Sequence, residues 1–129
     1  MSHRGVLRGL HMQRGEWGQA KLVRVSHGRV LDVNVDLRPG SPTFGRHVAV
    51  ELSQEDGGQL FVPRGFAHGF VVLSDTAQFQ YKVDNYYHPE AECTLRYDDP
   101  ALGIDWVLPE SELDLSEKDR RGLPLSDFS

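Results

Sequence analysis

Apolar residues along this chain recur at every second position far more often than at helical spacing, a period typical of half-buried β-strands. The segments RVLDVNVDL, RHVAVEL and AQFQYKV show it most clearly, and QLFV, GFVVL and CTLRY are shorter candidates. Turns rich in glycine and proline separate these segments, so the pattern predicts an all-β sandwich or barrel. In the first segment the alternation gives one apolar face, Leu31, Val33, Val35 and Leu37, and one polar face, Asp32, Asn34 and Asp36.

The C-terminal tail, from about residue 107 to residue 129, departs from this pattern. The stretch SELDLSEKDRR is read as a short helical segment, and Ser116 is placed to cap a final turn. No repeat or low-complexity linker divides the chain, so its 129 residues predict one domain with one core.

Composition narrows the classes of partner. A net charge of −5 argues against general binding to nucleic acid or to an anionic membrane surface, although local arginines and lysines can still bind an anionic ligand. The single cysteine, Cys93, excludes an intramolecular disulfide and suits a reducing compartment, and we interpret it as a partly buried strand residue. We therefore expect a cytoplasmic protein without a signal peptide or a membrane span.

Three polar residues lie on the apolar faces of predicted strands. Lys21 alternates with two valines in AKLVRV, Tyr81 shares a face with Phe79, and His11 shares one with Leu7. Each has an ordinary explanation: a lysine that reaches solvent at a strand end, a core tyrosine, a structural histidine. Together they offer a base, a cation and an acid that line one site.

Two motifs resemble those of the cupins, which are conical double-stranded β-helices of the jelly-roll type. In GGQLFVPRGFAHG, the residues Pro63, Gly65 and His68 follow the spacing P-x-G-x-x-H of the second cupin motif. GVLRGLHMQ resembles the first motif, with Gly5 upstream of His11. The resemblance implies a cupin-type jelly roll, in agreement with the strand pattern.

The metal ligands of cupins are only partly present. Metal-binding cupins continue the first motif as H-x-H, whereas this chain has Gln13 at the second position. Val72 stands where the second motif expects asparagine after its histidine. The His, His and carboxylate ligand set is therefore degraded, and we expect no metal.

Four long segments resemble one branch of the cupins. GVLRGLHMQ, GQAKLVRVSHGRVLDVNVDLRPGSPTFGRHVAVELS, LFVPRGFAHGFVVLSDTAQFQYKVDNYYHPE and YDDPALGIDW together resemble the dTDP-4-dehydrorhamnose 3,5-epimerase family, up to about residue 119. This resemblance implies an isomerase of dTDP-rhamnose or related deoxysugar biosynthesis that needs no cofactor. Its expected substrate is a dTDP-linked 4-keto-6-deoxy sugar: dTDP-4-dehydro-6-deoxy-D-glucose is converted to dTDP-4-dehydro-L-rhamnose, or only C3 or C5 is epimerised.

The chemistry explains why such residues are needed. The C4 ketone acidifies the C–H bonds at C3 and C5, and proton removal gives an enolate whose charge a nearby cation stabilises. Returning a proton to the opposite face requires a second group across the ring. The resemblance implies His11 as base, Asp119 and Asp32 as carboxylates near it, Tyr81 as acid, Lys21 as cation, Arg8 on the diphosphate, and Gln19, His68 and Tyr87 as further substrate-binding positions.

Members of the family normally begin a few dozen residues before the LRGLH motif, and their leader supplies strands exchanged across a dimer. This chain starts almost at that motif, so we expect a homodimer or larger assembly that covers the exposed strand edges differently. Two other functions stay open: a truncated, inactive cupin that binds a nucleotide sugar, and, with less support, a metal-dependent oxygenase that uses His11 and His68.

Overall fold

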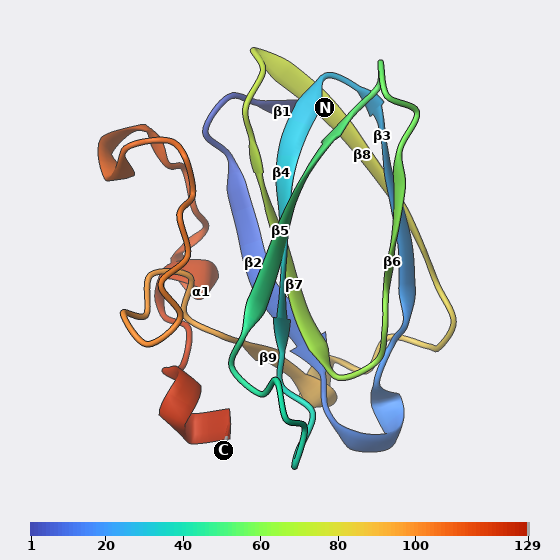
Figure 1. The fold of residues 1–129 in the computed structure, drawn as a ribbon, viewed down its shortest axis with the longest axis vertical. Helices are drawn as coiled ribbons and strands as arrows, with labels where there is room; N and C mark the ends of the chain where they lie inside the picture. The colour runs from blue at the N-terminus through green and yellow to red at the C-terminus, as the bar shows by residue number, and fades with distance from the viewer. Residues whose placement is uncertain (129) are drawn as a thin grey trace.

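A computed structural model of the chain describes residues 1–128. Two antiparallel sheets pack face to face, one five-stranded in the order β5-β4-β7-β2-β9 and one four-stranded in the order β1-β8-β3-β6 (Figure 1). Except for β4 and β5, neighbouring strands are not consecutive in the chain, as in a jelly roll, which confirms the predicted all-β class. The strands are β1 Ser2–His3, β2 Leu7–Gln13, β3 Lys21–His27, β4 Arg29–Asp36, β5 His47–Ser53, β6 Gln59–Val62, β7 Phe66–Val72, β8 Thr76–Val83 and β9 Glu92–Thr94.

Helical structure is sparse and confined to short turns. The only α-helix among residues 1–128 is α1, Glu117–Arg120, so the predicted short helical segment is present as a 3₁₀ turn and this single-turn helix, with extended chain between them. The predicted cap is confirmed, because the Ser116 hydroxyl accepts a hydrogen bond from the Asp119 backbone N–H at 3.2 Å. The 3₁₀ turns are η1 Gly15–Trp17, η2 Pro89–Ala91, η3 Glu110–Glu112 and η4 Leu125–Phe128.

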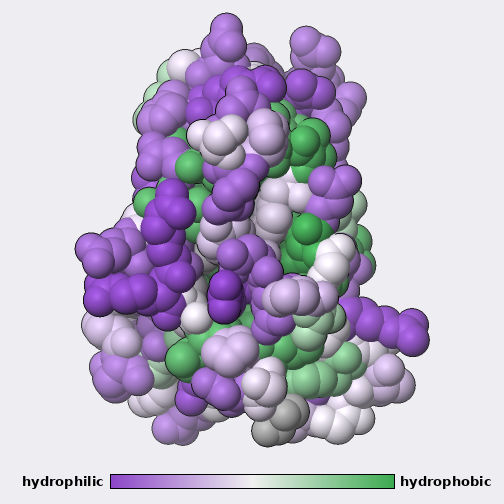
Figure 2. All heavy atoms as spheres, turned by 90° about the vertical axis from the view of Figure 1, so that its left-hand side faces the viewer, coloured by the Kyte–Doolittle hydropathy of each residue, from purple (hydrophilic) through white to green (hydrophobic). Residues whose placement is uncertain are grey.

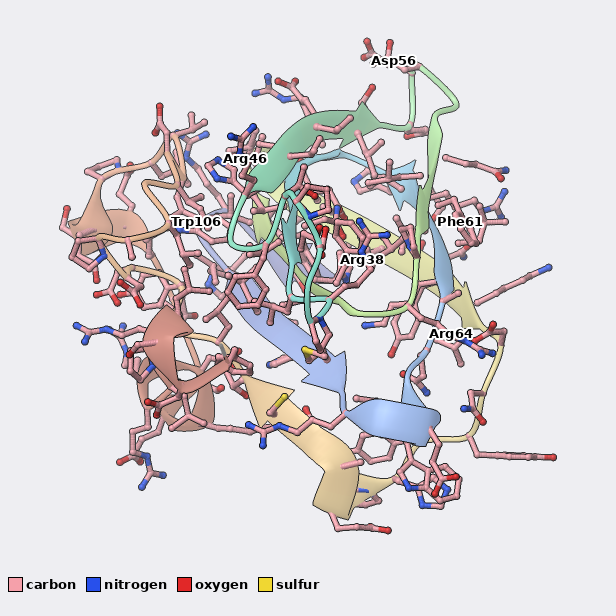
Figure 3. The ribbon with its side chains drawn as sticks, turned by 60° about the horizontal axis from the view of Figure 1, so that its bottom comes forward. Arg38, Arg46, Asp56, Phe61, Arg64 and Trp106 are labelled. Carbon is pink, nitrogen blue, oxygen red and sulfur yellow. The ribbon has the colours of Figure 1, made fainter. Side chains whose placement is uncertain are left out.

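Strand β4 is buried on both of its faces, unlike the half-buried strand that simple alternation suggests. Its apolar outer face packs against the C-terminal segment, which runs beside the five-stranded sheet (Figure 1). The outside of that segment is largely hydrophilic (Figure 2). Trp106 anchors the segment on this side, and Phe61 of β6 lies on the opposite side of the molecule (Figure 3). The polar face of β4 therefore looks inward, toward the four-stranded sheet.

The inner face of β8 changes from buried to exposed along the strand. Ala77 is 2% exposed, whereas Tyr81 and Val83 are 60% and 41% exposed. Phe79, between them, packs against the inner core that both sheets share. The inner surface therefore meets solvent at the end where β8 and β2 finish and β3 and β7 begin.

A compact polar loop follows β4 at this end. The buried carboxylate of Asp36 accepts hydrogen bonds from the backbone and guanidinium of Arg38 and from the hydroxyls of Ser41 and Thr43. The Arg38 guanidinium, helped by the two hydroxyls, holds the pKa of Asp36 well below its usual range despite burial. Arg38 also lies over the Phe66 ring, 5.0 Å from its centroid. These contacts fix the β4–β5 connection.

No helix within residues 1–128 is long and apolar enough to cross a membrane.

Candidate active site

A β-bulge in β2 decides which way His11 points. The register pairs Arg8 with Phe70 but His11 with His68, so β2 has one more residue than β7 over this interval. The expectation that His11 shares a face with Leu7 is therefore wrong. Leu7 packs in the outer core, and His11 lies on the inner face with Arg8.

Gly9 makes this bulge possible. Its φ is +133°, and a Cβ at this position would lie 2.6 Å from the Cα of Gly69 on the neighbouring strand. The same bulge directs the Gly9 N–H toward Asp119, which accepts it through Oδ2 at 3.2 Å. Strict alternation does not contain this extra residue, which is why Leu7 is wrongly expected on the face of His11, although His11 itself faces inward as expected.

His11 and Asp119 form a hydrogen-bonded pair although they lie far apart in sequence. The His11 Nε2 atom is 2.6 Å from Asp119 Oδ1. The Asp119 residue is 3% exposed, whereas the His11 side chain is 29% exposed. Burial raises the Asp119 pKa, but hydrogen bonds from His11 and the Gly9 backbone outweigh this, and the pKa lies below its ordinary value. Asp119 is therefore a carboxylate at neutral pH that orients the ring of His11.

A second histidine–carboxylate pair lies on the adjacent strands of the same face. His68 Nε2 is 2.7 Å from Asp32 Oδ2, and both residues are buried. The other oxygen of Asp32 accepts a 2.7 Å hydrogen bond from the Asn34 amide nitrogen. The ring of His68 stacks on Phe79 of β8 at a centroid distance of 5.7 Å, so it faces the opposite sheet.

The four-stranded sheet supplies the cation and the phenol. Lys21 and Tyr81 lie on the inner face of β3 and β8, as the alternation predicts, and the Lys21 Nζ atom is 5.9 Å from the centre of the Tyr81 ring. Burial lowers the Lys21 pKa from its ordinary value, and the charges of Asp32 and Glu92 partly oppose this. The tyrosine hydroxyl and the two histidines therefore come from opposite sheets.

Sequence reasoning missed Glu92 and Lys118, which form a cluster with the predicted Tyr87. Glu92 accepts hydrogen bonds from the Tyr87 hydroxyl and, at 2.6 Å, from Lys118 Nζ. Burial raises the Glu92 pKa, but these donors outweigh it, so the carboxyl group titrates below its ordinary range. Glu92 lies opposite Gln13 in the β2–β9 register, two residues from His11. Lys118 directly precedes Asp119 in α1, and that adjacency was the available signal.

Two predicted substrate-binding residues contact none of the others. The Gln19 amide donates to the Asn85 carbonyl at 3.1 Å and so ties the loop before β3 to the loop after β8. The exposed side chain of Arg8 makes no hydrogen bond or ion pair within residues 1–128 and is available to a ligand.

Within the same described residues, no group of three or more His, Cys, Asp or Glu side chains is arranged to hold a metal ion.

The chain is closely similar to proteins of one family. Residues 1–127 match the family model of dTDP-4-dehydrorhamnose 3,5-epimerase. The chain belongs to the dTDP-4-dehydrorhamnose 3,5-epimerase family. The resemblance seen in the sequence is thereby confirmed.

Relatives and solved structures of the epimerase family are closely similar. The dTDP-4-dehydrorhamnose 3,5-epimerase of Escherichia coli (strain K12) is 55% identical over 127 residues, which are 98% of this chain and 68% of that protein. The epimerase structure from Elizabethkingia anophelis NUHP1 has a TM-score of 0.96 at 55% identity and covers 98% of this chain and 69% of that one. The Legionella pneumophila epimerase, solved in complex with dTDP-4-keto-L-rhamnose, has a TM-score of 0.92 at 54% identity. The match covers 97% of this chain and 65% of that one. This chain thus spans about two thirds of the length of these epimerases.

Proposed function

We propose that this chain epimerises a dTDP-linked 4-keto-6-deoxy sugar by proton transfer next to the C4 ketone. The observation that carries the proposal is the placement of His11 on one sheet, held by Asp119 of α1, opposite Lys21 and Tyr81 on the other sheet. A sugar ring between the two sheets has one face toward the imidazole and the other toward the phenol. Inversion at a carbon needs removal and return of a proton on opposite faces, which this arrangement supplies.

His11 removes the proton. The Asp119 carboxylate can only accept hydrogen bonds, so the His11 Nε2 atom carries a proton and donates it to Asp119. The lone pair of the neutral ring then lies on Nδ1, which takes the C–H proton. The imidazolium formed in this step is stabilised by the adjacent carboxylate, whose geometry does not have to change.

Lys21 stabilises the enolate, and Tyr81 completes the inversion. When the proton leaves C3 or C5, negative charge develops on the C4 oxygen, and the ammonium of Lys21 is the cation on the inner face of β3. The exposed hydroxyl of Tyr81 then donates a proton to the carbon from the other side. Positioned acid and base groups each typically contribute about 10²–10⁴-fold to the rate.

The remaining residues are assigned to substrate binding. Arg8 lies on the same inner face as His11 and has a free guanidinium, the group best suited to a diphosphate. His68, Tyr87 and Gln19 are assigned to the walls around the nucleotide sugar, with His68 held by Asp32. The substrate is a dTDP-sugar by analogy with the Legionella epimerase complex.

The assembly and the compartment are also proposals. We infer a homodimer, because the short edge strands β1, β6 and β9 leave backbone groups that pairing with a second copy would satisfy. We infer a cytoplasmic enzyme, because the single, unpaired Cys93 suits a reducing compartment.

Deuterium exchange tests the function. The protein is incubated with dTDP-4-dehydro-6-deoxy-D-glucose in D₂O, and the sugar is followed by NMR. Deuterium is expected at both C3 and C5, and the His11→Ala variant is expected to lose at least about 100-fold in exchange rate. If the substrate raises the melting temperature of the protein while no exchange occurs at either carbon, the chain is a binding module and the enzymatic proposal is wrong.

A further inference from the structure

Asn34 is a buried polar residue to which neither the sequence resemblance nor the proposed mechanism gives a role. It lies on the inner face of β4, directly opposite His68 in the β4–β7 register, and is 6% exposed. Its amide nitrogen donates to Asp32 Oδ1 at 2.7 Å. Its amide oxygen is the only buried side-chain nitrogen or oxygen within residues 1–128 that has no hydrogen-bond partner.

The orphan oxygen follows from the orientation of the amide. Both oxygens of the Asp32 carboxylate are acceptors, so only the NH₂ end of Asn34 can face it. This orientation leaves the Asn34 oxygen without a donor, and a buried acceptor without a partner is unfavourable. Asn34 therefore contributes little to stability through its own hydrogen bonds, and its single side-chain hydrogen bond is the one to Asp32.

Asn34 completes a row of three groups that ends at His68. Asp32 is 0% exposed, and its two oxygens are divided between two donors, Oδ1 to Asn34 and Oδ2 to His68 Nε2. With Oδ1 held by Asn34, the carboxylate cannot turn Oδ2 away from the His68 ring. His68 then keeps its proton on Nε2 and leaves Nδ1 for the ligand.

We propose that Asn34 is a positioning residue that fixes the Asp32 carboxylate and, through it, the tautomer and orientation of His68. The functional part of this proposal rests on the proposed epimerase activity, in which His68 contacts the sugar. Without Asn34, the Asp32 Oδ1 atom loses its donor, the carboxylate can turn Oδ2 away from His68 Nε2, and the ring of His68 then populates both tautomers. The substrate then still binds, but fewer molecules hold it in the reactive geometry.

The first test uses the resting protein and does not depend on catalysis. Histidine ring nitrogens are labelled with ¹⁵N, and the His68 signals are assigned by their loss in a His68→Gln variant. The wild type is expected to show one tautomer, with Nε2 protonated, and Asn34→Ala is expected to show averaged shifts for the two nitrogens. The control is Val48→Ala, because Val48 is the β5 neighbour of Asn34 and is 57% exposed. An unchanged His68 tautomer in Asn34→Ala overturns the proposal.

The second test uses Asn34→Asp, which keeps the shape of the side chain. Two carboxyl groups side by side share one proton, and the protonated group donates to Asp32 as the amide does. The single His68 tautomer is therefore expected while His68 is neutral and the two carboxyl groups still hold their shared proton, and it is expected to be lost when a further rise in pH removes that proton. His68 and Lys21, the other charged or titratable groups next to Asp32, are the same in both proteins. A variant whose pH response matches that of the wild type contradicts the proposal.

Kinetics connect the position of His68 to activity. In Asn34→Ala, kcat is expected to fall about tenfold with KM within about twofold, because geometry rather than binding is lost. A changed tautomer with unchanged kcat refutes the functional part of the proposal. If the wild type itself shows no exchange, the proposed activity fails, while the NMR result still decides whether Asn34 positions His68.

Discussion

Replacing Asp119 by asparagine reverses the hydrogen bonding of His11 with almost no change in shape. The Asp119 side chain accepts two hydrogen bonds, one from the Gly9 N–H and one from His11 Nε2. In Asp119→Asn, the amide oxygen must face the Gly9 N–H, because two donors repel. The NH₂ group then faces Nε2 of His11, which must accept and so moves its own proton to Nδ1.

This geometry sets the size of the effect. A proton on Nδ1 occupies the lone pair that takes the substrate proton, so the base is blocked rather than weakened. We expect kcat to fall about 10⁴-fold in Asp119→Asn, which is about 5.5 kcal/mol of transition-state stabilisation. Asp119→Ala removes the orienting group but leaves both tautomers accessible to His11, so we expect a smaller loss, about 10²-fold. The isosteric variant should therefore be the worse enzyme.

The assay compares turnover and deuterium exchange in the two variants, with melting temperatures to confirm folding. The His3–Asp114 contact, in which Nε2 and Oδ2 lie 3.1 Å apart and both side chains are more than 60% exposed, provides the matched control. Asp114→Asn removes a histidine-facing carboxylate outside the site and is expected to leave turnover within about twofold of the wild type. An alanine variant as slow as Asp119→Asn would refute the tautomer argument. Near-normal turnover in both variants would remove Asp119 from the mechanism.

Three further changes have defined outcomes. In Lys21→Arg, the alkaline limb of the pH profile of kcat/KM should move to higher pH. Burial lowers the Lys21 pKa, so the lysine loses its positive charge as the pH rises, whereas arginine stays protonated. The control Lys82→Arg, on the outward face of β8, should leave this limb unchanged. In Asp36→Ala, the free energy of unfolding measured with urea near pH 7 should fall by about 2–3 kcal/mol. For Asp56→Ala, at an exposed position, it should fall by at most about 0.5 kcal/mol. Since the Asp36 pKa is depressed, its contribution is present above the unfolded-state pKa, and the difference from wild type should shrink as the pH falls below about 4. In Gly9→Ala, stability should fall by about 3 kcal/mol and kcat/KM at least about 100-fold, because the added Cβ lies 2.6 Å from a backbone Cα; a well-folded, active variant would contradict this.

The alternation of apolar and polar residues predicted correctly which side chains face inward wherever a strand keeps a regular register with its neighbours. The inward facing of Lys21 and Tyr81 followed from period two alone, because β3 and β8 keep their register over those residues. The same rule wrongly placed Leu7 on the face of His11, because the bulge between them shifts the register by one residue. A glycine in a strand is a known sign of a bulge, and Gly9 was the available sign.

Contacts across the chain were beyond local pattern. Asp119 lies in a polar tail that reads as solvated, and only the family resemblance assigned it to His11. Its burial depends on the fold of the C-terminal segment against the five-stranded sheet, which no spacing rule predicts. Glu92 and Lys118 were missed for the same reason, since their ion pair joins β9 to α1.

The stereochemical course of exchange tests the central claim most directly, namely that His11 and Tyr81 act on opposite faces of the sugar. Wild type and Tyr81→Phe are each incubated with dTDP-4-dehydro-6-deoxy-D-glucose in D₂O, and the recovered sugars are analysed for deuterium and configuration at C3 and C5. We predict inverted, deuterated product from the wild type, and from Tyr81→Phe deuterated sugar of retained configuration, because His11 still removes the proton and can return deuterium only to the same face. Inversion by Tyr81→Phe at the wild-type rate would contradict the account.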